Sequence, residues 1–187
     1  MIKPHHIISI GIAILPLLGC PAQRAGQLPM PAPRDTLPSQ VIDDFKLSET
    51  QLGRRVWVLT AEEANNYNQR QEVELFRLRI EFYNSTGDSV NAVMTAKKGR
   101  INTASRDMEA KDSVVITSRD SLIMITDSIR WDNQDRRLRT ESRVRLTRGN
   151  DWLSGEGMEA SPDLKEIELK RNVRGQKELL DDLSKIR

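Results

Sequence analysis

The sequence predicts an all-β domain of antiparallel strands that form a twisted, jelly-roll or solenoid-like sheet. Three observations predict it: apolar and charged residues alternate along strand-length stretches, turn-forming residues recur between these stretches, and Pro162 is the only proline after Val41. Proline cannot donate a hydrogen bond to a strand ladder, so a long stretch with one proline suits continuous strands. We expect the folded domain to span residues 41–175.

The alternation is clearest in residues 76–82 and 138–146. In both stretches, charged residues at every second position alternate with apolar, Thr or Ser residues. Such a period of two is typical of half-buried strands. In the first stretch we expect Phe76, Leu78, Ile80 and Phe82 on one face, and charged residues on the other. Turn residues predict the strand ends at 84–88, 118–120, 132–135, 149–151 and 161–163.

The folded part also contains an internal repeat. Residues 107–114, 137–144 and 166–173 align with one another at steps of 30 and then 29 residues. Residues 93–101, 123–131 and 152–160 align at the same two steps, so each period holds two strands. Repeats of this kind must stack to bury their apolar faces, which predicts a continuous apolar interior.

The N-terminus has the layout of a secretory signal, which we place at residues 1–19. Lys3 precedes an apolar run from Ile7 to Leu18 that is shorter than the roughly 20 residues a membrane-spanning helix needs. The sequence Leu17-Leu18-Gly19-Cys20 resembles the lipobox at which bacterial lipoproteins are cleaved and acylated on cysteine. We therefore expect lipidation of Cys20, with an ordinary signal peptide or an uncleaved anchor as the alternatives.

Two further segments flank the predicted domain. Residues 20–40 contain five of the eight prolines of the chain and are expected to form a disordered tether. Residues 176–187 are expected to form a short amphipathic C-terminal helix. Its apolar face would consist of Leu179, Leu180, Leu183 and Ile186. This helix would cover the last strand edge, dock on a partner or mediate dimerisation.

The composition argues against catalysis in the folded part. Cys20 is the only cysteine, and both histidines, His5 and His6, lie in the expected signal. Nucleophiles and bases built on cysteine or histidine, zinc sites and disulfides are thereby excluded. The carboxylate pairs at 62–63 and 181–182 have no such partner and are better explained as helix or loop surface. We expect no enzyme, no metal and no cofactor, and the formal net charge of +2 gives no reason to expect nucleic-acid binding.

Residues spread between Asp44 and Gly175 resemble, in order and spacing, those of the LptC family of lipopolysaccharide export. The residues that carry the resemblance are Gly53, Trp57, Leu59, Ala61, Ala64, Ile80, Phe82, Tyr83, Gly87, Ala96, Gly99, Met108, Ala110, Val114, Ile116, Leu122, Thr126, Trp131, Asp132, Thr140, Val144, Gly155, Gly157, Asp163 and Leu164. The resemblance implies a twisted β-jelly roll of the LptA/LptC type. It also implies that the protein accepts lipopolysaccharide from the inner-membrane ABC transporter and passes it to a periplasmic LptA-like jelly-roll protein.

This function would use an apolar groove for acyl chains and strand edges that pair with the neighbouring proteins. The expected lining residues are Trp57, Leu59, Leu78, Ile80, Phe82, Val114, Ile116, Met124, Trp131, Leu138, Val144 and Leu146. The alternative for each of them is ordinary core packing. A scaffold lipoprotein that transfers no lipid is the alternative for the whole chain.

Two charged segments allow two interpretations each. The arginines of residues 130–148 would contact lipid phosphates or would form a solvated face with the interspersed acidic residues. The last strand, at about residues 165–174, would be a docking edge or one protected by its own charges or by the tail.

The expected location is the periplasmic face of the cell envelope, with a lipid anchor in the inner rather than the outer membrane. The sequence departs from the family pattern, in which many members have an N-terminal transmembrane helix, and it adds the tail after Gly175. Pro21 also stands where an aspartate would favour inner-membrane retention in enteric bacteria.

Overall fold

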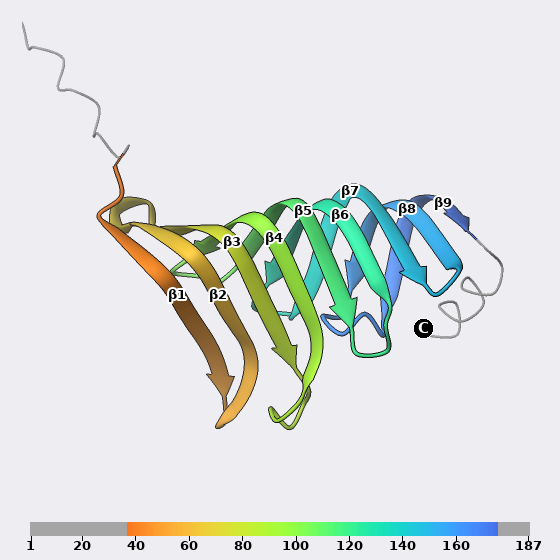
Figure 1. Ribbon diagram of the computed structural model, residues 1–187, viewed down its shortest axis with the longest axis horizontal. Coiled ribbons are helices and arrows are strands. Elements are labelled where there is room, and N and C mark those ends of the chain that lie inside the picture. The colour runs from red at the N-terminus through yellow and green to blue at the C-terminus, as the bar shows by residue number, and fades with distance from the viewer. Residues whose placement is uncertain (1–36, 176–187) are drawn as a thin grey trace, which may run out of the picture. The chain divides into compact units, whose positions relative to one another are not determined.

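The computed structural model describes residues 37–175, which form one open antiparallel sheet of nine strands in chain order (Figure 1). The strands are β1 (Gln40–Gln51), β2 (Arg54–Tyr67), β3 (Glu72–Tyr83), β4 (Val90–Asn102), β5 (Met108–Ser118), β6 (Ile123–Asp132), β7 (Arg137–Arg148), β8 (Asp151–Ala160) and β9 (Ile167–Gly175). A single 3₁₀ turn, η1 (Asn68–Arg70), joins β2 to β3 within the described residues.

The predicted all-β class and the antiparallel arrangement are confirmed. The repeat is confirmed as well, because its three periods correspond to the strand pairs β4–β5, β6–β7 and β8–β9. Each strand pairs only with its sequence neighbours, so the sheet is an open meander without the crossovers of a Greek-key jelly roll. The expected signal, most of the tether and the C-terminal helix lie outside the described residues.

A line of irregularities crosses the strands near their middles. Register shifts interrupt the pairing between Thr95 and Lys98 in β4 and at equivalent places in every later strand pair. Positive φ angles mark the same line in other strands, for example 51° at both Asp44 and Arg77 and 64° at Asp112. Bulges of this kind bend a strand and increase its twist. Figure 1 shows the result, because the strands curve so that one half of the sheet passes behind the other.

We call the two parts half-sheet 1 and half-sheet 2. Half-sheet 1 holds the strand ends joined by residues 52–53, 84–89, 119–122 and 149–150. Half-sheet 2 holds the strand ends joined by residues 68–71, 103–107, 133–136 and 161–166. A single core cluster contains buried residues of both, so the inner face of each half-sheet covers that of the other.

The bulge in β3 also changes which residues face the core. Leu75 and Leu78 are both buried although they are three positions apart, because Arg77 occupies the bulge between them. The prediction that Phe76 shares a face with Leu78 was therefore wrong. Phe76 lies half-buried beside Glu74 at a shallow cavity that is also lined by Lys98.

The β3–β4 loop is fixed by Asn84. Its Oδ1 accepts hydrogen bonds from the backbone N–H groups of Gly87, Asp88 and Ser89 at 2.9, 3.2 and 3.3 Å. Gly87 has a φ of +78°, and a Cβ placed there would lie 2.6 Å from the backbone nitrogen of Arg55. The loop therefore packs against the start of β2 in a way that only glycine permits.

We expect Gly87→Ala to lower the free energy of unfolding by roughly 3 kcal/mol or more, because backbone strain and a backbone clash combine. Gly53→Ala is the matched control, since Gly53 has a φ of +76° but a Cβ placed there would meet no atom within 4 Å. The control should cost only about 1 kcal/mol. Urea unfolding of both variants measures the difference, and equal losses would contradict the close packing of the loop.

Candidate functional site

The space between the half-sheets is the candidate functional site. All twelve residues predicted to line a groove are buried there and belong to the single core cluster, none with more than 3% of its surface exposed. The buried polar residues among those described are Ser118, Thr126 and Thr140. The Thr126 hydroxyl donates to the Arg143 carbonyl oxygen at 2.9 Å, so it adds no free polar group to the interior. The site is apolar and is filled by its own side chains.

An aromatic contact joins the half-sheets. The rings of Phe82 at the end of β3 and Trp131 at the end of β6 have centroids 5.4 Å apart and planes tilted by 43°. Strands β3 and β6 are not neighbours in the sheet, so the contact depends on the bend. A tilted pair at this distance is within the favourable range for aromatic side chains.

Two buried indole groups lack hydrogen-bond partners. The Nε1 atoms of Trp57 and Trp131 are both buried without an acceptor. Buried donors are nearly always satisfied in folded proteins, so these two are exceptions that call for an explanation. Both residues were predicted from the sequence to line the groove, but no sequence pattern indicated that their N–H groups would be unpaired.

The open side between the two rows of loops is the mouth of the site. A cavity of about 320 Å³, which we call the mouth cavity, is lined there by both half-sheets. Its walls come from the β1–β2 turn, the end of β3 and the β6–β7 and β8–β9 loops, and Phe82 and Trp131 also line it. A second cavity of about 300 Å³ adjoins it and shares Phe82, Tyr83, Asn84, Ser85 and Pro162. An ion pair between Glu49 of β1 and Arg106 of the β4–β5 loop, at 2.9 Å, also spans the open side.

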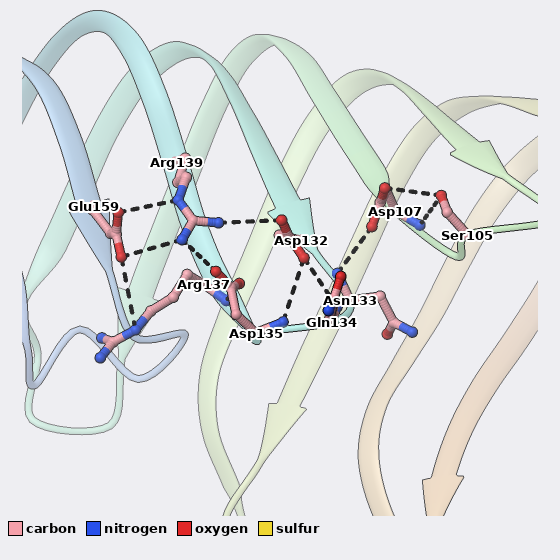
Figure 2. A network of polar contacts seen from close by, with 9 residues as sticks. All are labelled: Ser105, Asp107, Asp132, Asn133, Gln134, Asp135, Arg137, Arg139 and Glu159. Atoms are coloured by element: carbon pink, nitrogen blue, oxygen red, sulfur yellow. Dashed lines mark hydrogen bonds and ion pairs between the residues drawn. The ribbon is translucent and has the colours of Figure 1, made fainter.

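Polar contacts fix the β6–β7 loop at the mouth (Figure 2). Asp132 Oδ1 accepts from the backbone N–H groups of Gln134 and Asp135 at 3.0 and 3.4 Å. Asp107 of the β4–β5 loop accepts from the backbone N–H of Asn133 at 3.0 Å. These bonds hold the loop from both sides, as the dashed lines of Figure 2 show.

Arg139 is the centre of this network. Its guanidinium contacts Asp132 at 3.3 Å and Glu159 at 3.0 Å, and it also donates to Asp135. The hydrogen bond from Arg139 lowers the pKa of Asp135 below its ordinary value and raises the pKa of Arg139. Glu159 also lies near Arg137, whose Nη2 pairs with Glu166 at 2.7 Å. The acidic residues of this region are therefore occupied by Arg137 and Arg139.

The arginines of residues 130–148 differ in their surroundings. Arg137, Arg139, Arg143 and Arg148 form ion pairs with carboxylates, as a solvated charged face would. Arg136 differs from these four because it lines the mouth cavity.

The sheet ends in two edge strands, β1 and β9. Most residues of β9 are exposed, and the strand is fixed from one side by Glu141 of β7. The Glu141 carboxylate accepts from Lys170 at 2.8 Å and from Arg171 at 3.2 Å. The hydrogen bond from Lys170 is the largest cause of the lowered pKa of Glu141. Neither edge has a further strand beside it among the described residues.

Two other features, a metal site and a membrane-spanning helix, are absent from the part of the chain that the structure describes. Within residues 37–175, no group of three or more histidine, cysteine, aspartate or glutamate residues is arranged to hold a metal ion. The same residues include no helix that is long and apolar enough to span a membrane.

A comparison with protein families gives a match over most of the chain. Residues 7–178 match the family described as "Lipopolysaccharide-assembly, LptC-related". The match includes every described strand. No curated protein matches the chain at a significant level.

The Arg139 network generates a pH-dependent prediction. The folded state lowers the pKa of Asp135, so this contact stabilises the fold above the ordinary aspartate pKa of about 3.9 and is lost as the pH falls through the folded-state pKa. In Arg139→Gln we expect the pKa of Asp135 to rise toward its ordinary value, because the hydrogen bond from Arg139 is the largest cause of the lowering. An NMR titration of the side-chain carboxyl carbon measures it.

Arg143→Gln is the control, because Arg143 pairs with Glu156 at 3.8 Å and not with Asp135. The control should leave the Asp135 titration unchanged. An unchanged Asp135 pKa in Arg139→Gln would show that Arg139 is not the cause of the shift.

Proposed function

Because the chain belongs to the LptC-related family of lipopolysaccharide assembly, we propose that its sheet carries lipopolysaccharide between membrane-bound and periplasmic partners. Members of this family are transport components of the cell envelope and not enzymes. In the proposed function, the inner-membrane ABC transporter delivers the lipid, its acyl chains pass between the half-sheets, and an LptA-like jelly-roll protein receives it.

The observation that carries the proposal is the composition of the interior. An apolar cluster extends across the strands of both half-sheets and contains residues from β2 to β8. Acyl chains need a continuous apolar surface and no directional partner, which such an interior provides. Reactive side chains would serve no purpose in a passive conduit, and the energy would come from the transporter.

Lipid entry requires the half-sheets to separate, because side chains fill the interior. The Phe82–Trp131 contact and the Glu49–Arg106 ion pair would then open. Exposed ion pairs contribute little, typically about 0–1 kcal/mol, so the packed side chains provide most of the resistance. Acyl chains would replace these apolar contacts with others of the same kind.

The dense packing also supports the scaffold as a second candidate function. A domain that only holds other envelope proteins together would need a filled core and exposed edges, and both are present. The two functions differ in whether lipid ever contacts the interior.

Strand pairing is the proposed mode of contact with protein partners. The outer edges of β1 and β9 have no strand partner among the described residues, so a neighbouring strand could bond their backbone groups by β-augmentation. The exposed Val41 of β1 and Val173 of β9 add apolar contact area at these edges.

Photo-cross-linking in cells tests the conduit. A photoreactive amino acid at Phe82, Trp131 or Val144 should attach to lipopolysaccharide, in proportion to transporter activity, because all three side chains are buried between the half-sheets. Arg143 is the matched control, since it is adjacent to Val144 but its side chain is 79% exposed. Attachment there should stay at background.

Each variant must first prove to be folded, for example by resistance to protease. Folded variants that attach no lipid at any of the three interior positions would refute the conduit and leave the scaffold as the better function.

We further propose that lipidated Cys20 tethers the domain to the membrane, and that the inner membrane holds the anchor. The lipobox-like residues 17–20 support this proposal. Two or more acyl chains give stable attachment, since each buried methylene contributes about 0.8 kcal/mol.

Mass spectrometry of the protein purified from membranes tests the anchor. The wild type should begin at an acylated Cys20, and Cys20→Ser should keep its N-terminal segment and lose the acyl mass. A wild-type protein that carries no acyl group would contradict the proposal.

A further inference from the structure

The geometry points to a binding site for a phosphate group in the mouth cavity, formed by Arg54, Arg55 and Arg136. This inference rests on the proposed function where the phosphate belongs to a lipid head group. The cavity, of about 320 Å³, lies at the lower end of the range of roughly 300–1,000 Å³ that is usual for small-molecule sites. It is bounded by residues far apart in the sequence, which the bend of the sheet brings together.

The charge of the cavity is unbalanced. Arg54, Arg55 and Arg136 line it, and none of its lining residues is an aspartate or a glutamate. Within the described chain, these three arginines form no ion pair with a carboxylate. Most arginines on the neighbouring strands do form one, as Arg137 and Arg139 illustrate. Three like charges around one cavity favour an anion there.

Neutral contacts hold the first two arginines in place. The Arg55 guanidinium lies 4.5 Å from the centre of the Tyr83 ring, and its Nε donates to the Gly87 carbonyl oxygen at 3.3 Å. Arg54 Nη1 donates to the Ser85 carbonyl oxygen at 3.5 Å. These contacts orient the side chains but leave their charges uncompensated, so the arginines are arranged for an external anion.

The loop that carries Arg136 is fixed in a similar way. Arg136 has a φ of 60°, and its backbone N–H donates to the Asp132 carbonyl oxygen at 2.9 Å. The carboxylates of Asp132 and Asp135 on the same loop already bind Arg139 (Figure 2). The network therefore engages both acidic side chains of this loop with Arg139.

The deep wall of the cavity suits the remainder of an amphiphile. Phe82 and Trp131 line it and also belong to the apolar core, so the cavity connects cationic and apolar surface. Trp131 also has the unpaired, buried Nε1–H group described above. Leu52, at the tip of the β1–β2 turn, also lines the cavity and is 95% exposed.

Phosphate is an anion that fits this arrangement. The planar guanidinium group donates two parallel hydrogen bonds to phosphate oxygens, and arginine is favoured over lysine where such recognition is needed. All three cations of the cavity are arginines. A phosphate on a lipid whose acyl chains enter the interior would lie at this place.

Inorganic phosphate is the first probe, and the tryptophan indoles of the full-length protein report its binding. The chain has three tryptophans, so its ¹H–¹⁵N spectrum has three indole signals. Millimolar phosphate should shift the Trp131 signal and leave that of Trp152, which does not line the cavity, unchanged. The double variant Arg54→Gln/Arg136→Gln should abolish the shift.

Arg145→Gln is the control for the loss of charge, because Arg145 lies over Trp152 and not at the cavity. Both substituted cavity arginines are exposed, so the double variant should retain the wild-type thermal midpoint. Arg55 is left unchanged because it packs on Tyr83.

Two lipids with the same acyl chains identify the source of the phosphate. A phosphorylated glycolipid should bind the wild type about tenfold more tightly than its dephosphorylated form, and the double variant should bind both equally. A shift with inorganic phosphate but equal lipid affinities would assign the site to free phosphate. No Trp131 shift together with equal lipid affinities would overturn the inference.

The outcomes separate this site from the proposed function. If interior cross-linking persists but neither probe detects phosphate, only the mouth site is wrong. If neither lipid binds and interior cross-linking fails, the conduit is wrong, and the inorganic phosphate titration still decides whether the cavity binds an anion.

Discussion

The structure depends on one constraint: a single sheet must bury one of its two faces without help from a second layer. It does so by bending every strand along one line of bulges, so that the half-sheets cover each other. Polar and charged residues occupy the outer side of the bend, where Arg77 and Glu62 form an ion pair across β3 and β2. The apolar interior and its open side both follow from this bend.

The bend also explains why polar side chains gather at the mouth. At the bend, the two half-sheets are joined by continuous strands, whereas at the mouth they are joined by side chains from strand ends and loops. These loops are shaped by Asn84, Gly87 and the Arg139 network, and their polar groups surround the end of the apolar core. A ligand that is apolar at one end and charged at the other matches this arrangement, in which an apolar core ends at a polar rim.

The sequence predicted the strands, turns, two-strand repeat and core residues well, because period-two alternation and turn chemistry are local signals. The bulges have no comparable signal, since residues as different as Asp44, Arg77 and Ser113 occupy them. Phe76 was misplaced for that reason. The mouth cavity was missed because it joins Arg55 to Arg136, and only the bend brings residues of such distant strands to one cavity. No local sequence signal indicates which arginine of residues 130–148 would line that cavity.

A filled interior is compatible with lipid passage because of how the two half-sheets meet at the mouth. Among residues 37–175 the sheet is open, so β1 and β9 do not pair with each other and no described strand ladder seals the mouth. Separating the half-sheets would therefore break side-chain contacts and leave the backbone hydrogen bonds of the nine strands intact. Apolar contacts are non-directional, so acyl chains can replace much of what opening removes. A closed barrel would have to break a strand pair to admit the same lipid, whereas separating these half-sheets would break none of the strand pairs of the described sheet.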